Sequence, residues 1–426
     1  MQFKTYLCPP IYGTIAQLVE QRIENPCVPG SNPGGTTSEG SAQALPFFVT
    51  FVSMSEVMST PEQRLANVLT ELQPDCVAWI HEDVLAPLLL EHYESTFRKS
   101  GIQCLHVAEM QGGEQCKHWE SLPELFDLFG AWGLTRRSVV LTTGGGALSD
   151  AVGMATSIWK RGMRVVHMPT TPLAAVDAAW GGKTAFNWRG AKNQVGTIHP
   201  PEHVHLDARW MQTLGAREFR AGLAEAVKHA MLDPKALTWM QSHNNPRAED
   251  IHWEEMTRWF ENMSLTKRTI VNDDLNEQGE RNLLNLGHTV AHALEAAATD
   301  QGEVLLHGEA VAIGLRFALF EAKEGSLSKE PLGEESLKDA AWIERWLQTH
   351  LPMPELTWPT AEVLWHWMSH DKKNVHAEVR DMAWRGIGQI HWPVIWEKSA
   401  FEATWTRFLR LTFSEASDSR PLHTKP

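Results

Sequence analysis

The chain has 426 residues, of which 43% are hydrophobic and 21% charged, a balance typical of a globular protein with two or three domains. Its formal net charge of -14 argues against a general nucleic-acid-binding protein. The five cysteines form no Cys-x-x-Cys pair and no apolar run near the start is long enough to span a membrane, so we expect a cytoplasmic protein without a disulfide framework or thiolate metal site.

Residues 1–53 are not predicted to form a domain. They mix Pro, Gly, Ser and Asn without a sustained hydrophobic period, and the segment 16–35 resembles the translation of a transfer-RNA gene read in a coding frame. We interpret this region either as a disordered extension or as the product of a start codon assigned too early, with Met54 or Met58 as the true start.

Residues 54–208 predict an α/β NAD-binding domain built on a Rossmann-like parallel sheet. Short apolar runs at 76–80, 139–142 and 165–168 are typical of buried strands, and 151–161 has helical spacing. Strands that alternate with helices in this way indicate a parallel sheet with helices on its faces.

Residues 209–413 predict a mostly α-helical domain that binds metal and substrate. Strand patterns are nearly absent, and the polar tail 414–426 is expected to be disordered. Helical spacing of apolar residues recurs over 218–231, 253–271, 288–298, 307–324 and 337–349.

The glycine-rich segment 143–150 follows a predicted strand and opens a predicted helix. Glycines let a ligand approach the backbone closely, and the free N–H groups at a helix start attract anions. Thr170 and Thr171 follow the next strand, at the edge of the sheet where ligands bind in such folds. This pattern is typical of a dinucleotide pyrophosphate site, although a plain turn and a helix N-cap are compatible with it.

A basic segment begins at Asp177 and continues through 181–184 to Lys192 and Asn193. A loop with two glycines and two lysines suits an anionic substrate, or is simply a solvated surface loop. The glycine spacing of a P-loop is missing upstream, which excludes a nucleotide-triphosphatase motif. The basic element 371–374 by itself is typical of a solvated face.

Carboxylate and imidazole side chains in the helical part have the composition of a metal site. Glu225 lies among Ala, Leu and Val with Lys228 three residues on, so we expect it to be paired or to bind a metal. His288 and His292 share one helix face, and His307 follows. Two histidines and one carboxylate are a common catalytic zinc set, but the spacing does not say which two histidines bind.

Seven segments occur in an order that resembles the 3-dehydroquinate synthase family, over about residues 73–386. They are GGGALSD, RGMRVVHMPTTPLAAVDAAWGGKT, KNQVGTIHPPEHVHLD, EFRAGLAEAVKHAML, LLNLGHTVAHALE, HGEAVAIG and DKKN. The resemblance implies an enzyme that depends on NAD and on Zn²⁺ or Co²⁺ and assembles as a homodimer. The family favours Gly at Ser149, Phe at Leu286 and an acidic residue near His81, where this chain has Glu82 and Asp83 next in sequence.

The resemblance implies roles for individual residues of this chain. The family's cofactor residues correspond to Glu114, Lys117, Gly145, Gly146, Asp150, Thr170, Thr171, Lys183 and Lys192, with Asp83 as the contact to the adenosine ribose. Its metal ligands correspond to Glu225, His288 and His307, which leaves His292 for proton transfer. Its substrate and catalytic shell corresponds to Asp177, Lys183, Asn193, Lys228, Lys267, Arg281, Asn285 and Lys372. Arg161 corresponds to an arginine that reaches into the neighbouring subunit's site.

The implied reaction converts 3-deoxy-arabino-heptulosonate 7-phosphate, a phosphorylated acidic sugar, into 3-dehydroquinate and phosphate in the shikimate pathway of aromatic amino acid biosynthesis. It combines transient oxidation by NAD, phosphate elimination, re-reduction and intramolecular aldol closure. Neither nucleic acid nor a membrane is an expected partner.

Three alternative functions stay open. A metal- and NAD-dependent polyol dehydrogenase of the glycerol dehydrogenase type has a similar layout, but it does not need the basic residues around the site. Another sugar-phosphate cyclase would act on a neutral heptulose phosphate, and Arg281 with Asn285 argues for an acidic substrate instead. A non-catalytic metal- or nucleotide-binding protein leaves His292 unexplained.

Overall fold

The computed structural model describes residues 59–189, 191–243, 252–327, 330–370 and 378–418. The predicted extension 1–53 and Lys372 lie outside these ranges, so their interpretations stay predictions. The proposed division at residues 208 and 209 stays a prediction as well.

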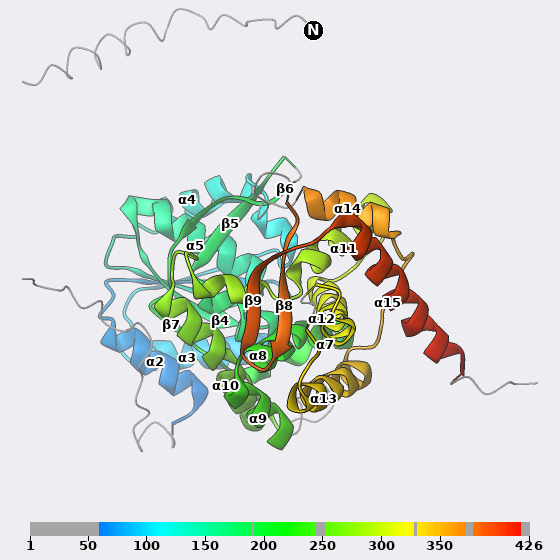
Figure 1. Cartoon of the computed structure of the whole chain (residues 1–426). Coiled ribbons are helices and arrows are strands. Elements are labelled where there is room, and N and C mark those ends of the chain that lie inside the picture. Colours follow the sequence, from blue (N-terminus) through cyan, green and yellow to red (C-terminus); the bar gives the residue numbers. More distant parts are fainter. Residues whose placement is uncertain (1–58, 190, 244–251, 328–329, 371–377, 419–426) are drawn as a thin grey trace, which may run out of the picture. The chain divides into compact units, whose positions relative to one another are not determined.

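Five parallel strands form a sheet in the first half of the chain (Figure 1). Their spatial order is β2 (Leu105–Met110), β1 (Val77–Glu82), β3 (Val139–Gly144), β4 (Arg164–Pro169) and β7 (His203–Val204). Every neighbouring pair is parallel. β1 and β3 are buried along their whole length, which explains why their sequences are continuous apolar runs without alternation. The predicted α/β fold class is therefore confirmed.

Helices cover both faces of this sheet. They are α2 (Pro61–Glu71) and α3 (Pro87–Lys99) on one face, and α4 (Ser121–Ala131) and α5 (Gly146–Ile158) on the other. Successive strand residues point to opposite faces, so Trp79 packs in the core with α2 and α3 while Ile80 packs in the core with α4 and α5. α5 begins within the glycine segment 143–150, with Gly145 as its N-cap residue.

The basic segment predicted as a loop forms a β-hairpin instead. β5 (Lys183–Trp188) pairs antiparallel with β6 (Ala191–Ile198). Phe186 is fully buried and belongs to the core that contains α4 and α5, which fixes the hairpin to the sheet domain. Two short helices, α6 (Pro172–Val176) and η4 (Ala178–Trp180), lead from β4 to this hairpin.

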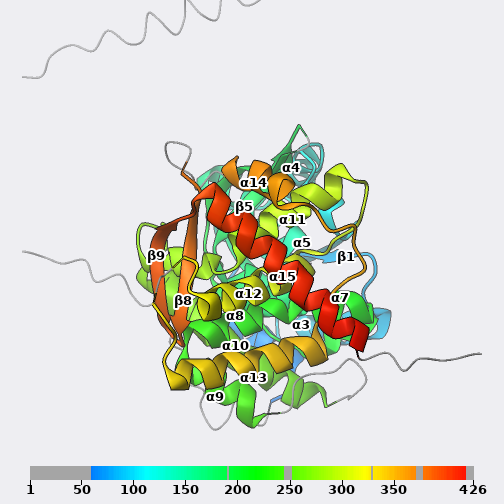
Figure 2. The ribbon, with the colours of Figure 1, turned by 45° about the vertical axis from the view of Figure 1, so that its right-hand side comes forward.

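The second half of the chain is mostly helical, as predicted (Figures 1 and 2). Its helices are α7 (Ala216–Gly222), α8 (Ala224–Leu232), α9 (Pro234–Ser242), α10 (Trp253–Asp273), α11 (His288–Asp300), α12 (His307–Glu324), α13 (Glu334–His350), α14 (Ala361–Ser369) and α15 (Lys398–Asp418), with the 3₁₀ segment η6 (Glu280–Asn285) before α11. They share one hydrophobic core, to which α12 contributes residues along most of its length. The predicted helix 218–231 is divided at Leu223 into α7 and α8.

Two predictions about this half are wrong. A hairpin of β8 (Arg380–Gly386) and β9 (Gln389–Ile395) lies where strands were not expected. β8 is buried at almost every position and so lacks the alternation that reveals a half-exposed strand. α15 continues to Asp418, beyond the predicted end at 413, because 414–418 contains no Gly or Pro that would stop a helix. No helix in the described ranges is long and apolar enough to cross a bilayer.

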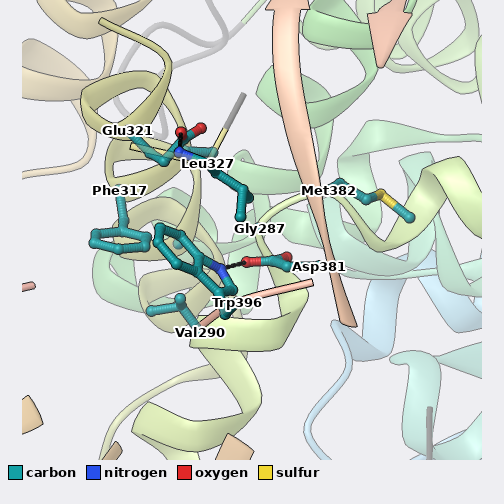
Figure 3. A pocket seen from close by; sticks show the side chains of 10 residues that line it. Gly287, Val290, Phe317, Glu321, Leu327, Asp381, Met382 and Trp396 are labelled. Atoms are coloured by element: carbon teal, nitrogen blue, oxygen red, sulfur yellow. Dashed lines mark hydrogen bonds between the residues drawn. The ribbon is translucent and has the colours of Figure 1, made fainter. Parts of the chain in front are cut away.

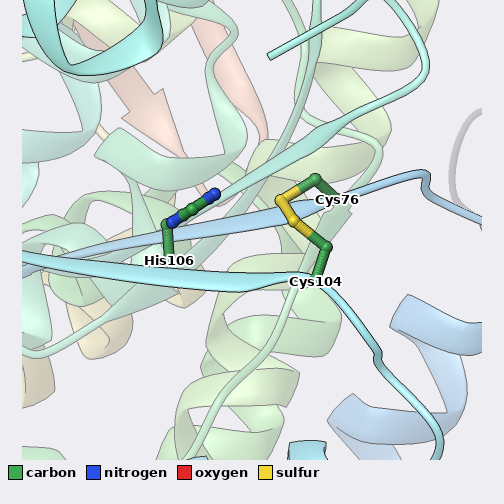
Figure 4. Close-up of side chains that lie close together, drawn as sticks. All are labelled: Cys76, Cys104 and His106. Carbon is green, nitrogen blue, oxygen red and sulfur yellow. A yellow bond between two sulfur atoms is a disulfide. The ribbon is translucent and has the colours of Figure 1, made fainter. Parts of the chain in front are cut away.

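The sequence argued against a disulfide framework, but the structure contains a disulfide. Cys76 and Cys104 form a disulfide, with His106 beside it (Figure 4). Each cysteine immediately precedes a strand, and β1 and β2 are paired with Val77 opposite Leu105. The pairing brings the two cysteines together across 28 residues of sequence, a proximity that no short-range cysteine spacing could reveal.

Candidate active site

Glu225, His288 and His307 converge in the helical part of the molecule. Glu225 lies in the first turn of α8, His288 begins α11 and His307 begins α12. The Glu225 carboxylate oxygen Oε1 lies 3.3 Å from His288 Nε2 and 3.4 Å from His307 Nε2. One ligand atom from each residue lies within 4.8 Å of the others, the spacing of a divalent-metal site.

Glycines on α12 allow this convergence. A Cβ added to Gly308 would lie 1.8 Å from the Ala221 carbonyl oxygen, just before α8, and one added to Gly314 would lie 2.0 Å from the Gly287 carbonyl oxygen, just before α11. Only glycine permits such close backbone contact. α12 therefore docks directly on the two segments that precede the other two ligands.

The outer ring nitrogens of both histidines have acceptors. His288 Nδ1 donates to the Leu286 carbonyl at 3.1 Å, and His307 Nδ1 donates to Glu295 Oε2 at 3.0 Å. These contacts orient each ring so that its Nε2 atom faces the Glu225 carboxylate. The donor set therefore fits a divalent cation such as Zn²⁺.

His292 lies beside the same set without belonging to it. Its ring centroid is 5.5 Å from that of His288 and 6.3 Å from that of His307. The role in proton transfer that the family resemblance implies for His292 stays a prediction.

Two buried lysines and the carboxylate Asp177 form a chain of ion pairs that ends on Glu225. Asp177 accepts from Lys267 at 3.0 Å and from Lys228 at 3.3 Å, and Lys228 also pairs with Glu225. Burial would raise the pKa of Asp177, but Lys228 and Lys267 hold it well below its usual value. Burial would likewise lower the pKa of Lys228, but Asp177 and Glu225 raise it above its usual value. Both remain charged at neutral pH because each charge compensates the other.

A second basic group surrounds η6. Arg281 is 2% exposed and donates through Nη2 to the Gly181 carbonyl at 2.5 Å. Lys183 pairs with Glu277, which also accepts from Asn285 Nδ2 at 3.2 Å. Burial would raise the pKa of Glu277, but Lys183 lowers it, so this carboxylate is ionised.

The glycine segment opens α5 at the carboxyl end of β3. Gly145 is the N-cap and Gly146 the first helical residue, so their N–H groups lie at the positive end of a 13-residue helix. A Cβ added to Gly144 would lie 2.9 Å from Glu82 Cδ, and Gly145 N donates to Glu82 Oε1 at 2.9 Å. Glu82 therefore faces this segment, and the ribose contact predicted for Asp83 stays a prediction.

Lys117 joins the predicted cofactor loop to α5 and β6. The buried lysine donates to Asp150 Oδ2 at 2.7 Å and to Asn193 Oδ1. Glu114, in the same loop, accepts from Asn187 Nδ2 of β5 at 2.8 Å. Burial raises the pKa of Asp150 to about 6, although Lys117 opposes the shift.

Of the remaining predicted residues, Thr170 and Thr171 lie against the glycine segment and the others are more exposed. Thr171 caps α6 by accepting from Ala174 N at 3.2 Å, and Thr170 is buried at the end of β4. Lys192 is 65% exposed, with Nζ 3.8 Å from Glu295 Oε1. Asp83 accepts from Gly112 N at 3.1 Å, and Arg161 is exposed at the end of the 3₁₀ turn after α5.

Two acidic residues of the site were missed in the sequence. They are Glu277, between Lys183 and Asn285, and Glu295, behind His307. Glu295 carried a signal, because it follows His288 by seven residues and so shares its helix face. Glu277 lies in a loop, where the spacing of residues in the sequence does not predict a partner.

A small cavity lies behind the start of α11 (Figure 3). It is lined by Gly287, Val290, Phe317, Asp381 and Trp396 among others, and Asp381 accepts from Trp396 Nε1 at 2.9 Å. The cavity borders Gly287, the residue that precedes His288. None of the three proposed metal ligands lines it, so it is not part of the proposed metal site.

The fold is a parallel sheet with a glycine segment at its carboxyl edge, and the helical part brings one carboxylate and two histidines together beside buried lysines. These features are typical of an α/β enzyme that binds a nucleotide and a metal ion. Family models describe the sequence as "3-dehydroquinate synthase N-terminal" over residues 107–221 and "3-dehydroquinate synthase C-terminal" over 222–374. The chain belongs to the 3-dehydroquinate synthase family.

Individual relatives agree with this assignment. The chain is 36% identical to the 3-dehydroquinate synthase of Laribacter hongkongensis over 302 residues, which cover 71% of this chain and 80% of that protein. It is 37% identical to the Ruegeria pomeroyi 3-dehydroquinate synthase over 331 residues, or 76% and 86% of the two chains. The structure matches the 2-epi-5-epi-valiolone synthase of Streptomyces hygroscopicus, solved with NAD⁺ and Zn²⁺, with a TM-score of 0.67, 26% identity, and 82% and 95% coverage.

Proposed function

We propose that the chain converts 3-deoxy-arabino-heptulosonate 7-phosphate into 3-dehydroquinate and phosphate. The observation that carries this proposal is the convergence of Glu225, His288 and His307 beside the buried lysines Lys228 and Lys267. A substrate with a carboxylate and a phosphate needs such opposing charge. The family and its curated relatives support the same reaction.

In this proposal a divalent cation, Zn²⁺ or Co²⁺, binds to Glu225, His288 and His307. NAD binds at the glycine segment around Gly145 and Gly146, at the start of α5, where the Gly145 N–H that would meet the pyrophosphate donates to Glu82 in this structure. When bound, the cation polarises substrate hydroxyls and NAD accepts and returns a hydride, so the reaction has no net redox change. The cofactor residues Glu114, Lys117, Asp150, Thr170, Thr171, Lys183 and Lys192 complete this site in the proposal, with Asp83 or Glu82 for the adenosine ribose.

The chain's own residues orient the substrate. Lys228, Lys267, Arg281 and the partly exposed Lys183 supply positive charge, and Lys372 is proposed to add to it. Arginine suits planar anions because its donors form a fork. Asp177 keeps Lys228 and Lys267 in place by hydrogen bonding to both.

One group is suited to proton handling. His292 lies beside the proposed metal ligands, so it can exchange a proton with a substrate oxygen held there. Glu277 contacts both Lys183 and Asn285, so it can orient these two residues toward the substrate.

We further propose a homodimer in a cytoplasmic location. The exposure of Arg161 leaves its guanidinium available to a neighbouring subunit. NAD and sugar phosphates are metabolites of the cell interior, which supports the location.

The test is incubation with the heptulosonate phosphate, Zn²⁺ and a catalytic amount of NAD, following phosphate and NADH together. We expect phosphate release in excess of NAD without accumulation of NADH. Stoichiometric NADH would instead indicate a polyol dehydrogenase. Turnover of a neutral heptulose phosphate in preference to the acidic sugar would indicate another cyclase.

A further inference from the structure

We propose that Glu295 is a positioning residue of the metal site, which fixes the orientation of the ligand His307. This inference rests on the proposed function, because it assumes that His307 binds the cation. It assigns a role to a carboxylate that neither touches the cation nor belongs to the predicted site residues.

Glu295 lies on the helix face that carries the other histidines. It follows His288 by seven residues and His292 by three on α11, so all three side chains project to the same side. Its side chain is 18% exposed, and its Oε2 atom lies 3.0 Å from His307 Nδ1 on the neighbouring helix α12. The contact therefore joins α11 to α12 directly at the metal site.

The contact fixes the orientation of the ring. A carboxylate oxygen accepts, so the hydrogen of this bond lies on His307 Nδ1, and Nε2 is the ring nitrogen that faces Glu225. A carboxylate in this position also makes the imidazole a better ligand and restricts its rotation.

His288 shows the same arrangement with a different partner. Its Nδ1 donates to the Leu286 carbonyl, which belongs to the backbone. Both ligands are therefore oriented with Nε2 toward Glu225. Only the restraint on His307 depends on a side chain, so it alone can be removed by substitution.

The other oxygen of Glu295 faces the proposed cofactor lysine. Lys192 Nζ lies 3.8 Å from Oε1, but the lysine side chain is 65% exposed. An exposed ion pair at this distance contributes little energy. Glu295 consequently acts mainly on His307, and replacing Lys192 with Met is expected to leave metal affinity unchanged.

The experiment measures Zn²⁺ affinity of the whole chain by competition with a chelator, without NAD or substrate. Glu295→Gln is expected to weaken Zn²⁺ binding by about 10- to 100-fold, and to change the visible spectrum of the Co²⁺-substituted protein. Glu295→Asp, which keeps the carboxylate, is expected to restore part of the affinity. Asp300→Asn removes an exposed carboxylate from the same helix and is the matched control, with unchanged binding.

A second comparison separates a positioning role from a structural one. In a His307→Ala background, Glu295→Gln is expected to cause no further loss of Zn²⁺ binding, because the residue through which it acts is absent. Circular dichroism establishes that each variant is folded, and Glu295→Asp serves if the glutamine variant is not.

The inference is overturned if Glu295→Gln binds Zn²⁺ with the affinity and Co²⁺ spectrum of the unmodified chain. It is equally overturned if the loss is the same size with and without His307. A failure of the proposed function looks different, since the unmodified chain would then bind no Zn²⁺ or His288→Ala would retain it.

Discussion

Lys228 and Lys267 are held in the candidate active site by the carboxylates beside them. Asp177 accepts hydrogen bonds from both ammonium groups, and Glu225 pairs with Lys228. Burial lowers the pKa of Lys267, and the neighbouring Lys228 adds to this effect against the opposing Asp177. Asp177 therefore offsets the cost of burying the positive charges of Lys228 and Lys267.

Replacing Asp177 with Asn should destabilise the folded protein. We expect a loss of about 3–5 kcal/mol in the free energy of unfolding, because two buried lysines lose a shared partner. Urea denaturation at pH 7 measures the change. Asp300→Asn, an exposed carboxylate on α11, is the control and should change stability little. Equal stability of the two variants would contradict the role of Asp177 in compensating the two lysines.

Replacing His288 with Ala tests whether this histidine is a metal ligand together with Glu225 and His307. The substitution removes one of two imidazole donors, so bound Zn²⁺ and phosphate-releasing activity should be lost together. Metal analysis of the purified protein measures the first and the phosphate assay the second. Zinc retained at the level of the unmodified chain would refute the ligand role.

At the scale of elements, α12 determines how the site is assembled. It carries His307, and its glycines contact the backbone just before α8 and just before α11. Residues that are far apart in the sequence therefore meet because three helices dock closely.

Gly314→Ala should disturb this docking. Its Cβ would lie 2.0 Å from the Gly287 carbonyl oxygen, so α11 or α12 must shift. We expect a loss of about 1–3 kcal/mol in the free energy of unfolding, together with weaker Zn²⁺ binding. The matched control is Gly333→Ala, whose Cβ would meet nothing within 4 Å. Denaturation and chelator competition measure both, and unchanged Zn²⁺ affinity in Gly314→Ala would contradict the role of this contact.

Some helices and strands could be predicted from the sequence and others could not. Buried strands such as β1 and β3 were predictable because continuous apolar runs reveal them, and α12 was predicted with its observed bounds. The β8–β9 hairpin was missed because β8 lacks alternation. Glu225, His288 and His307 were found through the family's motifs, whereas the acceptors of their outer nitrogens depend on tertiary contacts that spacing does not encode.

At the scale of the whole molecule, three histidines are buried around β4 and β7. Burial lowers the pKa of His167 to about 3 and that of His203 to about 4, and it lowers the pKa of His205 well below its usual value. All three are therefore neutral in the folded protein at pH 6, whereas in the unfolded chain they begin to bind protons near pH 6.5.

This difference predicts sensitivity to acid. Stability contributed by these histidines is complete above about pH 6.5 and is lost as the pH falls toward their folded values, by at most about 1.4 kcal/mol per histidine and pH unit. His167→Gln should reduce this slope between pH 6.5 and 4, and the exposed His118→Gln should not. Urea denaturation across that range measures the slopes. An unchanged slope in His167→Gln would contradict the assignment.

The central claim is that one divalent cation lies among Glu225, His288 and His307, close to a bound NAD. Anomalous X-ray diffraction at the zinc edge, on crystals grown with Zn²⁺ and NAD, tests it most directly. The account predicts a strong peak between the two Nε2 atoms and the Glu225 carboxylate, with NAD density leading to it from the glycine segment. A strong peak only elsewhere, for example beside Cys76, Cys104 and His106, would contradict it.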